Sequence, residues 1–195
     1  MRLFIALDID DIIRDRIARF LEGLRGFAPD ARWIRPEALH VTLKFIGERP
    51  EEEVEAIHQA LSNVAAGPLA VTFRGYGFFP GAQAARVFWL GIDSGPELVA
   101  LAKAVDQAMA GLGIPKEDHA FSPHLTLARG GRGSGAPQPQ PDDRPNLRFG
   151  KLQGKLATMP TPGFGTMTAR EFWLYKSQLL RGGSRYTKIA SFSLP

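Results

Sequence analysis

Cysteine is absent from all 195 residues of the chain. This absence excludes a disulfide framework, an iron–sulfur cluster, a thiolate zinc site and a cysteine nucleophile. Long apolar runs are missing as well, because the opening run from Arg2 to Leu7 is broken by Asp8. That run is too short for a signal peptide or a membrane helix, so we expect no membrane partner and a soluble, cytoplasmic protein.

Acidic residues are scarce in the last part of the chain. Residues 123–195 hold 11 Lys and Arg against 3 Asp and Glu, a net charge of +8, whereas residues 1–122 carry a net charge of −4. A basic segment of this kind fits a polyanionic partner, and it fits a solvated basic surface equally well. Charge alone leaves both interpretations open.

Hydrophobic periodicity predicts short strands mixed with helices. Helices are expected to begin near Asp10 or Asp11, at Pro50 and at Pro96, each followed by apolar residues at helical spacing. The expected strands are 2–7, 32–35, 39–46, 69–79, 85–92, 123–128, 148–158, 169–179 and 185–194. Because strands and helices follow no strict alternation, the fold class is α+β with largely antiparallel sheets.

Residues 130–146 are low in complexity and rich in Gly and Pro. Such a segment has too few apolar side chains to pack into a core, so we expect a flexible loop inside a single domain that spans residues 1–195. Three arginines at or near this loop, Arg132, Arg144 and Arg148, are candidates for an electrostatic funnel toward an RNA backbone. A loop that merely aids solubility is the competing interpretation.

One short motif occurs twice. His40-Val-Thr-Leu43 recurs as His124-Leu-Thr-Leu127, and these two copies contain half of the four histidines. Side chains two residues apart on a strand point to the same face, so each copy places its His and Thr together and its two apolar residues toward the core. Two such strands facing each other would form a cleft with two imidazoles and two hydroxyls.

This arrangement suits in-line displacement at phosphorus. One imidazole can accept a proton from the attacking oxygen while the other donates a proton to the leaving oxygen, and threonine hydroxyls can bind the phosphate oxygens. A metal site is a weaker interpretation, because two histidines without a nearby paired carboxylate offer too few ligands. The competing structural interpretation is a pair of histidines that only satisfy hydrogen bonds in a core.

With these motifs the chain resembles the 2H phosphoesterase superfamily, defined by paired His-x-Thr-x motifs, and within it the RNA 2′,3′-cyclic phosphodiesterases, also called LigT-like or 2′-5′ RNA ligase-like proteins. The resemblance covers nearly the whole chain. It is carried by Arg2-Leu-Phe-Ile-Ala-Leu7, Leu39-His-Val-Thr-Leu-Lys-Phe-Ile-Gly47, Arg86-Val-Phe-Trp-Leu-Gly91, Phe121-Ser-Pro-His-Leu-Thr-Leu-Ala-Arg129, Leu174-Tyr-Lys-Ser177, Gly183, Tyr186 and Phe192-Ser-Leu194.

The resemblance implies a bilobal fold with two pseudo-symmetric lobes, whose antiparallel sheets line a central cleft with helices outside. It implies metal-independent hydrolysis of an RNA 2′,3′-cyclic phosphate to a 2′-phosphomonoester, with no cofactor, by a protein expected to be a monomer. His40 is then the proton donor and His124 the proton acceptor. Thr42, Thr126 and Arg129 would hold the phosphate.

Strict strand alternation conflicts with one of these roles. Arg129 lies five residues after His124, which puts it on the opposite face unless Gly130 and Gly131 let the strand end or twist there. The same alternation places Lys44 on the His40 face. Five aromatic residues are candidates for stacking on a base, with core packing as the alternative: Trp33, Phe45, Tyr76, Phe121 and Tyr186.

Two other functions use the same cleft. Reversible 2′-5′ RNA ligation would run the chemistry backwards, with a 5′-hydroxyl replacing water as the nucleophile. A binding module for a nucleotide or RNA would use the cleft without turnover. Substitution of His40 or His124 separates an enzyme from a binder, because only an enzyme has a rate to lose.

Overall fold

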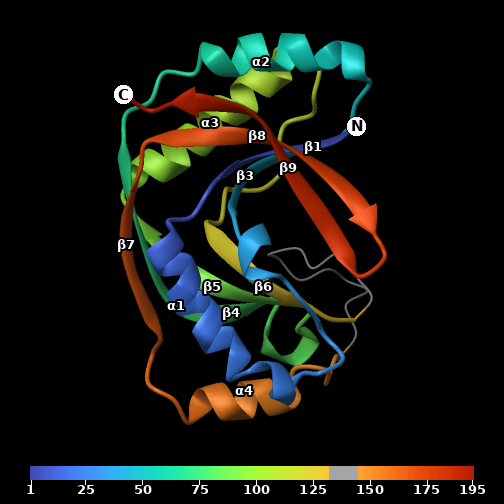
Figure 1. Ribbon diagram of the computed structural model, residues 1–195, viewed down its shortest axis with the longest axis vertical. Helices are drawn as coiled ribbons and strands as arrows, with labels where there is room; N and C mark the ends of the chain where they lie inside the picture. Colours follow the sequence, from blue (N-terminus) through green and yellow to red (C-terminus); the bar gives the residue numbers. More distant parts are fainter. Residues whose placement is uncertain (132–144) are drawn as a thin grey trace.

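Two antiparallel sheets form the centre of the molecule (Figure 1). The computed structural model describes residues 1–131 and 145–195. Sheet A has the strand order β3 (Val41–Glu48), β1 (Arg2–Leu7), β8 (Glu171–Leu180) and β9 (Gly183–Ser193). Sheet B has the order β2 (Arg32–Trp33), β6 (His124–Arg129), β5 (Val87–Ser94), β4 (Leu69–Phe79) and β7 (Gly163–Ala169).

The two sheets repeat one arrangement. The order β3-β1-β8-β9 corresponds to β6-β5-β4-β7, and β2 is an addition at the edge of sheet B. We call β3 and β6, the strands of the two His-x-Thr-Leu motifs, the motif strands. In each lobe a strand and a helix precede the motif strand. These are β1 and α1 (Asp11–Glu22) before β3, and β5 and α3 (Pro96–Ala110) before β6. The expected bilobal α+β fold with antiparallel sheets is therefore confirmed.

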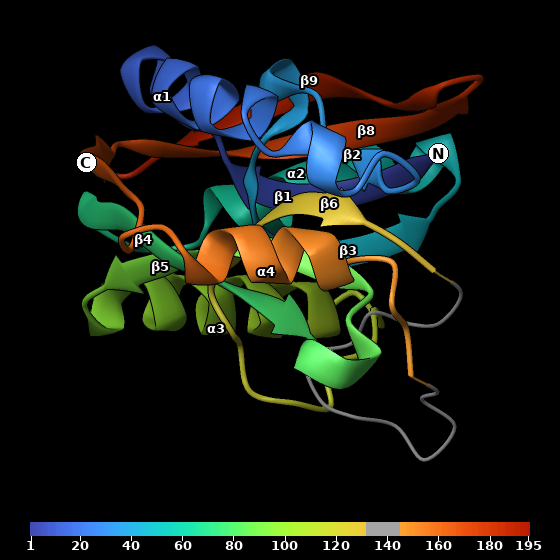
Figure 2. The same cartoon turned by 90° about the horizontal axis from the view of Figure 1, so that it is seen from below.

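Helices cover the outer sides of the sheets. In Figure 2, α1 and α3 lie on opposite sides of the strands, and contacts join α1 to β7 and α3 to β3. Two further helices, α2 (Val54–Ser62) and α4 (Gly150–Ala157), lie at the two ends of the long axis in Figure 1. Among residues 1–131 and 145–195, no helix is both long and apolar enough to cross a bilayer.

Each sheet buries the face opposite its motif residues. Along β1 the buried side chains of Leu3, Ile5 and Leu7 join one core cluster with Ile13 and Ile17 of α1. Burying such side chains stabilises the fold by about 1.5–3 kcal/mol each before entropy is counted. The alternate residues of sheet A face away from this core, and Phe4, Ala6 and Tyr175 form a second, small cluster on that side.

One expected strand is wrong. Residues 148–158 hold α4, whose Leu152 and Leu156 are buried four positions apart, which is helical spacing. The strand β7 (Gly163–Ala169) was not expected, because two of its first three residues are glycines, which weaken a strand signal. Gly165 has a positive φ of 106°. Most of the expected flexible loop at 130–146 lies outside the described residues, as do Arg132 and Arg144.

Both motif strands contain a β-bulge at the same place. Where β1 pairs with β3, Ala6 faces Thr42 and Ile5 faces Lys44, so Leu43 has no partner. Where β5 pairs with β6, Trp89 faces Thr126 and Phe88 faces Ala128, which leaves Leu127 without a partner. An extra residue reverses the alternation beyond it, because two consecutive side chains then point to the same face.

The first bulge moves Lys44 away from the His40 face. Its ammonium lies 2.6 Å from Asp106 of α3 and 2.9 Å from the carbonyl of Pro115, and its side chain is 1% exposed. Glu117 is a further partner at 3.5 Å. The expectation that Lys44 lies beside His40 is therefore wrong, and the residue instead joins β3 to α3 through a buried ion pair.

Asp106→Ala is expected to lower the free energy of unfolding by about 2 kcal/mol or more, since it leaves the ammonium of Lys44 buried without its nearest counter-charge. Lys44→Met removes the charge and keeps most of the volume, so it should cost much less. Urea unfolding of both variants gives the comparison. Equal losses of unfolding free energy in the two variants would contradict this account of the Lys44–Asp106 ion pair.

Candidate active site

The two motif strands contact each other across the centre of the molecule. His40, Thr42, His124 and Thr126 are all half-buried, whereas the intervening Val41, Leu43, Leu125 and Leu127 are buried in the main core. The alternation expected from the sequence is therefore observed up to each bulge. It leaves two imidazoles and two hydroxyls on the faces of β3 and β6 that do not pack into the core.

Each imidazole is held by the same hydrogen bond. Nδ1 of His40 lies 2.8 Å from the carbonyl oxygen of Ala38, and Nδ1 of His124 lies 2.7 Å from that of Ser122. A carbonyl oxygen only accepts, so Nδ1 carries the proton and donates it to the backbone in both rings. In the neutral form Nε2 of each ring is then unprotonated, and it is the nitrogen left for chemistry.

Burial lowers the pKa of both rings. It lowers the pKa of His40 from 6.5 to about 4, an effect opposed by the Ala38 hydrogen bond and by the charge of Asp8, and reinforced by Arg129 and His124. Burial also lowers the pKa of His124, with the Ser122 hydrogen bond opposing and Arg129 reinforcing. A bound anion would counter these effects, because a negative charge favours the protonated ring.

The second bulge brings Arg129 onto the face of β6 that carries His124. Leu127 and Ala128 are consecutive and both fully buried, so Arg129 returns to the face of His124 and Thr126. Its charge lowers the pKa of both histidines. The bulge, and not a twist at Gly130 and Gly131, resolves the conflict that strict alternation raised. All five residues expected in the site thus lie on the faces of the two strands that do not pack into the core, with His40 directly before β3.

Aromatic rings contact both histidines, three at His40 and one at His124. The ring of His40 lies 4.7 Å from that of Phe4 and 5.1 Å from that of Tyr186, with Tyr175 at 6.2 Å. On the other lobe, Phe79 contacts His124 edge-on at 4.9 Å. Of these, sequence reasoning named only Tyr186. Phe4 lies on β1, which pairs with β3, and Tyr175 lies on β8, which pairs with β1, so both reach His40 only in the folded sheet.

Three of the five candidate stacking residues pack into the core. Trp33 contacts Phe88 and donates Nε1–H to the carbonyl of Ala28, while Tyr76 and Phe121 pack against the main cluster. Phe45 is different, because it is 46% exposed and the guanidinium of Arg2 lies over its ring. Phe45 occupies the position after the first bulge that Arg129 occupies after the second.

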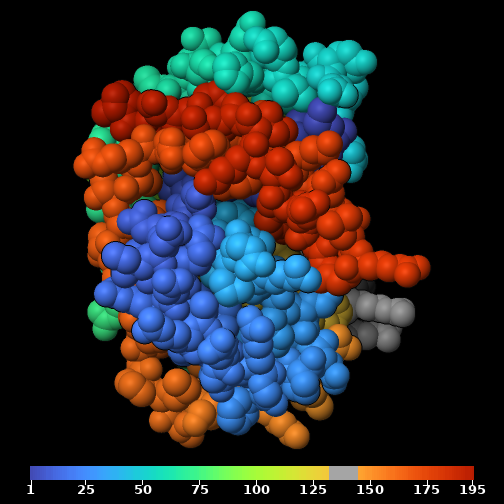
Figure 3. Space-filling model, in the orientation of Figure 1, coloured from blue at the N-terminus to red at the C-terminus, as the bar shows by residue number. Residues whose placement is uncertain are grey.

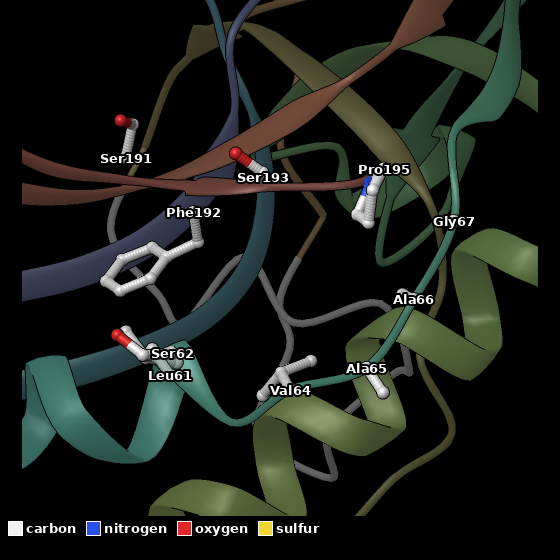
Figure 4. A pocket seen from close by; sticks show the side chains of 10 residues that line it. All are labelled: Leu61, Ser62, Val64, Ala65, Ala66, Gly67, Ser191, Phe192, Ser193 and Pro195. Atoms are coloured by element: carbon white, nitrogen blue, oxygen red, sulfur yellow. The ribbon is translucent and has the colours of Figure 1, made fainter.

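A separate hollow on the surface shares no residue with the motifs. It is lined by the end of α2, the linker 64–67 and the last residues of β9 (Figure 4). Its lining side chains are mainly small aliphatic groups and serine hydroxyls, with no histidine, lysine, arginine or side-chain carboxylate. It therefore offers no acid–base chemistry, and the candidate site is the pair of motif strands.

The chain is similar to known proteins over nearly its whole length. Residues 13–139 match the family described as the 2′-5′ RNA ligase superfamily. The chain is 34% identical over 192 residues to an RNA 2′,3′-cyclic phosphodiesterase of Archaeoglobus fulgidus, covering 98% of this chain and 99% of that protein. It is 29% identical to the Escherichia coli protein of the same name, over 99% of this chain and 96% of that one.

Solved structures show the same similarity. Escherichia coli LigT complexed with 3′-AMP matches with a TM-score of 0.75 and 28% identity, over 99% of this chain and 97% of that one. The protein TT0787 of Thermus thermophilus also matches at 0.75, with 29% identity over 100% of this chain and 98% of that one. The resemblance expected from the two motifs is thereby confirmed along the whole chain.

The low pKa of His40 predicts a specific loss of stability in acid. Unfolded His40 binds a proton near pH 6.5 that the folded ring takes up only near pH 4, so stability is lost as pH falls through this window. His40→Gln removes that loss, which amounts to at most about 3 kcal/mol. Urea unfolding at pH 7, 5.5 and 4 measures it. If the free energy of unfolding fell by the same amount with pH in wild type and variant, the low pKa of His40 would be contradicted.

Proposed function

The chain belongs to the 2′-5′ RNA ligase superfamily, and on this premise we propose that it hydrolyses RNA 2′,3′-cyclic phosphate ends to 2′-phosphomonoesters. The observation that carries the proposal is the matched pair of imidazoles, each with Nδ1–H bound to a backbone carbonyl and Nε2 left for proton transfer. The relatives named RNA 2′,3′-cyclic phosphodiesterase support the substrate class. Both motifs lie on one chain, so the reaction needs no second copy.

In the proposed reaction, Nε2 of His124 accepts a proton from water as the water oxygen attacks phosphorus. The bond between phosphorus and the 3′ oxygen breaks, and Nε2 of His40 donates a proton to that oxygen. The products are a 3′-hydroxyl and a 2′-phosphomonoester. The two rings exchange protonation states in each turnover, and solvent restores them, so no other reactant is consumed.

Thr42, Thr126 and Arg129 are proposed to hold the phosphate. Both hydroxyls lie two residues beyond a histidine on the same strand face, and a guanidinium suits charge that develops on phosphate oxygens. The substrate anion also explains how His40 becomes a donor although burial lowers its pKa to about 4. The phosphate charge favours the protonated ring, so binding and protonation are coupled. The cation of Arg129 offsets part of this rise in the pKa of His40, and it stabilises the transition state.

Substitution of either histidine should abolish most of the activity. His40→Asn and His124→Asn are each expected to lower kcat by about 10²–10⁴-fold on a 2′,3′-cyclic mononucleotide, the usual contribution of a general acid or base. Phosphorus NMR of EDTA-treated protein should show a 2′-monophosphate as the sole product. If an RNA with a 5′-hydroxyl is added and becomes joined through a 2′-5′ linkage, that product would favour ligation. Binding without turnover by the wild type would favour a binding module.

Five exposed arginines suit an RNA strand, and we call them the arginine collar: Arg32, Arg35, Arg129, Arg181 and Arg185. None of them forms an ion pair with any residue in 1–131 or 145–195. Arg32 pairs with Arg129 between β2 and β6, and the guanidinium of Arg35 approaches Gly182 in the turn between β8 and β9. Figure 3 shows this hairpin beside the segment that contains Arg35. Exposed cations on neighbouring segments attract phosphates.

The collar predicts a salt effect that depends on substrate length. For a cyclic-phosphate oligonucleotide, kcat/KM should fall steeply with salt, whereas the mononucleotide should change little. Arg185→Ala should make the logarithmic salt slope less negative by about 0.7, the value for one phosphate contact on a single strand. Lys103→Ala on the far side of α3 serves as the control. Equal slopes for wild type and Arg185→Ala would count against the collar.

A further inference from the structure

The two lobes differ in the surroundings of the motif histidine. In sheet A, Leu7 and Val41 are the last pair of β1 and β3, and Asp8 and His40 are the residues next to that pair. The charge of Asp8 acts on the ring of His40. In sheet B, His124 pairs with Gly91. A Cβ at Gly91 would lie 2.3 Å from the carbonyl oxygen of Arg74, so no side chain fits there. One histidine is therefore influenced by a carboxylate, and the other pairs with bare backbone.

The carboxylate of Asp8 is held by several donors. Its Oδ1 accepts hydrogen bonds from Nη2 of Arg14 at 2.6 Å and from the backbone N–H of Ile9 at 2.9 Å. Its Oδ2 accepts from the ammonium of Lys188, which also lies 4.2 Å from the ring centroid of Trp173. These donors keep the pKa of Asp8 below its usual value despite opposing burial, so the group is ionised at neutral pH.

Arg14 connects this carboxylate to the backbone that orients His40. Its Nη1 donates to the carbonyl of Pro36 at 2.9 Å, in the short turn Pro36–Ala38. The last residue of that turn supplies the carbonyl that accepts the His40 Nδ1 proton. Asp8, Arg14 and the turn therefore form a continuous set of contacts that ends at the ring of His40. Within residues 1–131 and 145–195, no such set of contacts joins an acidic side chain to the Ser122 carbonyl.

We propose that Asp8 is the positioning residue that makes His40 the proton donor and leaves His124 the proton acceptor, by placing a fixed negative charge and a braced turn on one side of the cleft only. This inference rests on the proposed function. The two His-x-Thr-Leu motifs alone give no reason why one histidine should donate a proton and the other accept one. The charge of Asp8 and the braced turn supply that physical cause. Asp8 acts through His40 and through the turn, and it does not itself contact the substrate.

The other groups around His40 do not supply this charge. Tyr175 of β8 and Tyr186 of β9 contact its ring. The cation of Arg129 and the second imidazole, both on β6, lower the pKa of His40, while Asp8 is the carboxylate that raises it. The cations Arg14 and Lys188 contact Asp8 itself. Removing the charge of Asp8 should therefore make His40 harder to protonate, and removing Lys188 should make it easier.

The test is the pH profile of kcat for Asp8→Asn on a 2′,3′-cyclic mononucleotide. Activity requires His124 neutral and His40 protonated in the complex, so the acidic limb reports His124 and the alkaline limb reports His40. We expect the alkaline limb to move about one pH unit toward acid, the acidic limb to stay, and kcat at pH 7.5 to fall about tenfold with little change in KM.

Three further variants separate the effect of the Asp8 charge from a structural effect of the substitution. Asp8→Glu keeps the charge and should restore the alkaline limb. Lys188→Met leaves Asp8 less neutralised, so the alkaline limb should move toward higher pH. Asp11→Asn removes a fully exposed carboxylate that also pairs with Arg14, at 3.9 Å, and should leave both limbs in place. A shift of both limbs in Asp8→Asn, or of neither, would overturn the proposal.

An NMR titration makes the inference testable apart from turnover. The Cε1–H resonance of His40 between pH 4 and 6 should show a partly protonated ring in the wild type and a neutral ring in Asp8→Asn, with the His124 resonance unchanged. If this difference is seen but no substrate is turned over, the proposed function fails and the coupling stands. If turnover is seen but the resonances do not differ, the coupling fails and the proposed function stands.

Discussion

The polar faces of β3 and β6 depend on one constraint, which is that the opposite face of each strand must stay buried. Val41 and Leu43 on one strand, and Leu125 and Leu127 on the other, belong to the main core. Rotating either strand would expose these residues and cost several kcal/mol of burial. The positions of His40 and His124 are therefore set by apolar side chains that take no part in chemistry. The backbone carbonyls of Ala38 and Ser122 then fix the rotation of each ring.

Sequence reasoning found the residues whose position depends on local alternation. His40, Thr42, His124 and Thr126 lie before the bulges, so a period of two was enough to place them together. Arg129 and Lys44 lie beyond the bulges. A bulge depends on how the neighbouring strand pairs, and a single strand sequence does not reveal that. Lys44 was consequently expected on the wrong face, and Arg129 reached the right one for an unexpected reason.

The same limit applies to Asp8 and to α4. Asp8 closes a strand in the sequence, and its importance becomes visible only when Lys188 arrives from β9, 180 residues later in the chain. In α4, two glycines weaken the helical signal, although Leu152 and Leu156 have helical spacing. Fold class and the repeated motif were thus accessible from local patterns. Long-range pairing partners were not.

Sheet A is assembled from the two ends of the chain, since β1 lies between β3 and β8 and the latter pairs with β9. During synthesis the motif strand β3 and its neighbour β1 emerge early, whereas Tyr175, Tyr186 and Lys188 emerge last. Pairing between segments so far apart in sequence is slow, because a large loop must close first. Sheet B draws β2, β4, β5 and β6 from the first 129 residues and lacks only β7. A nascent chain can therefore order the His124 lobe while the surroundings of His40 are still incomplete. His40 gains its neighbours Tyr175 and Tyr186 only once the hairpin of β8 and β9 has left the ribosome.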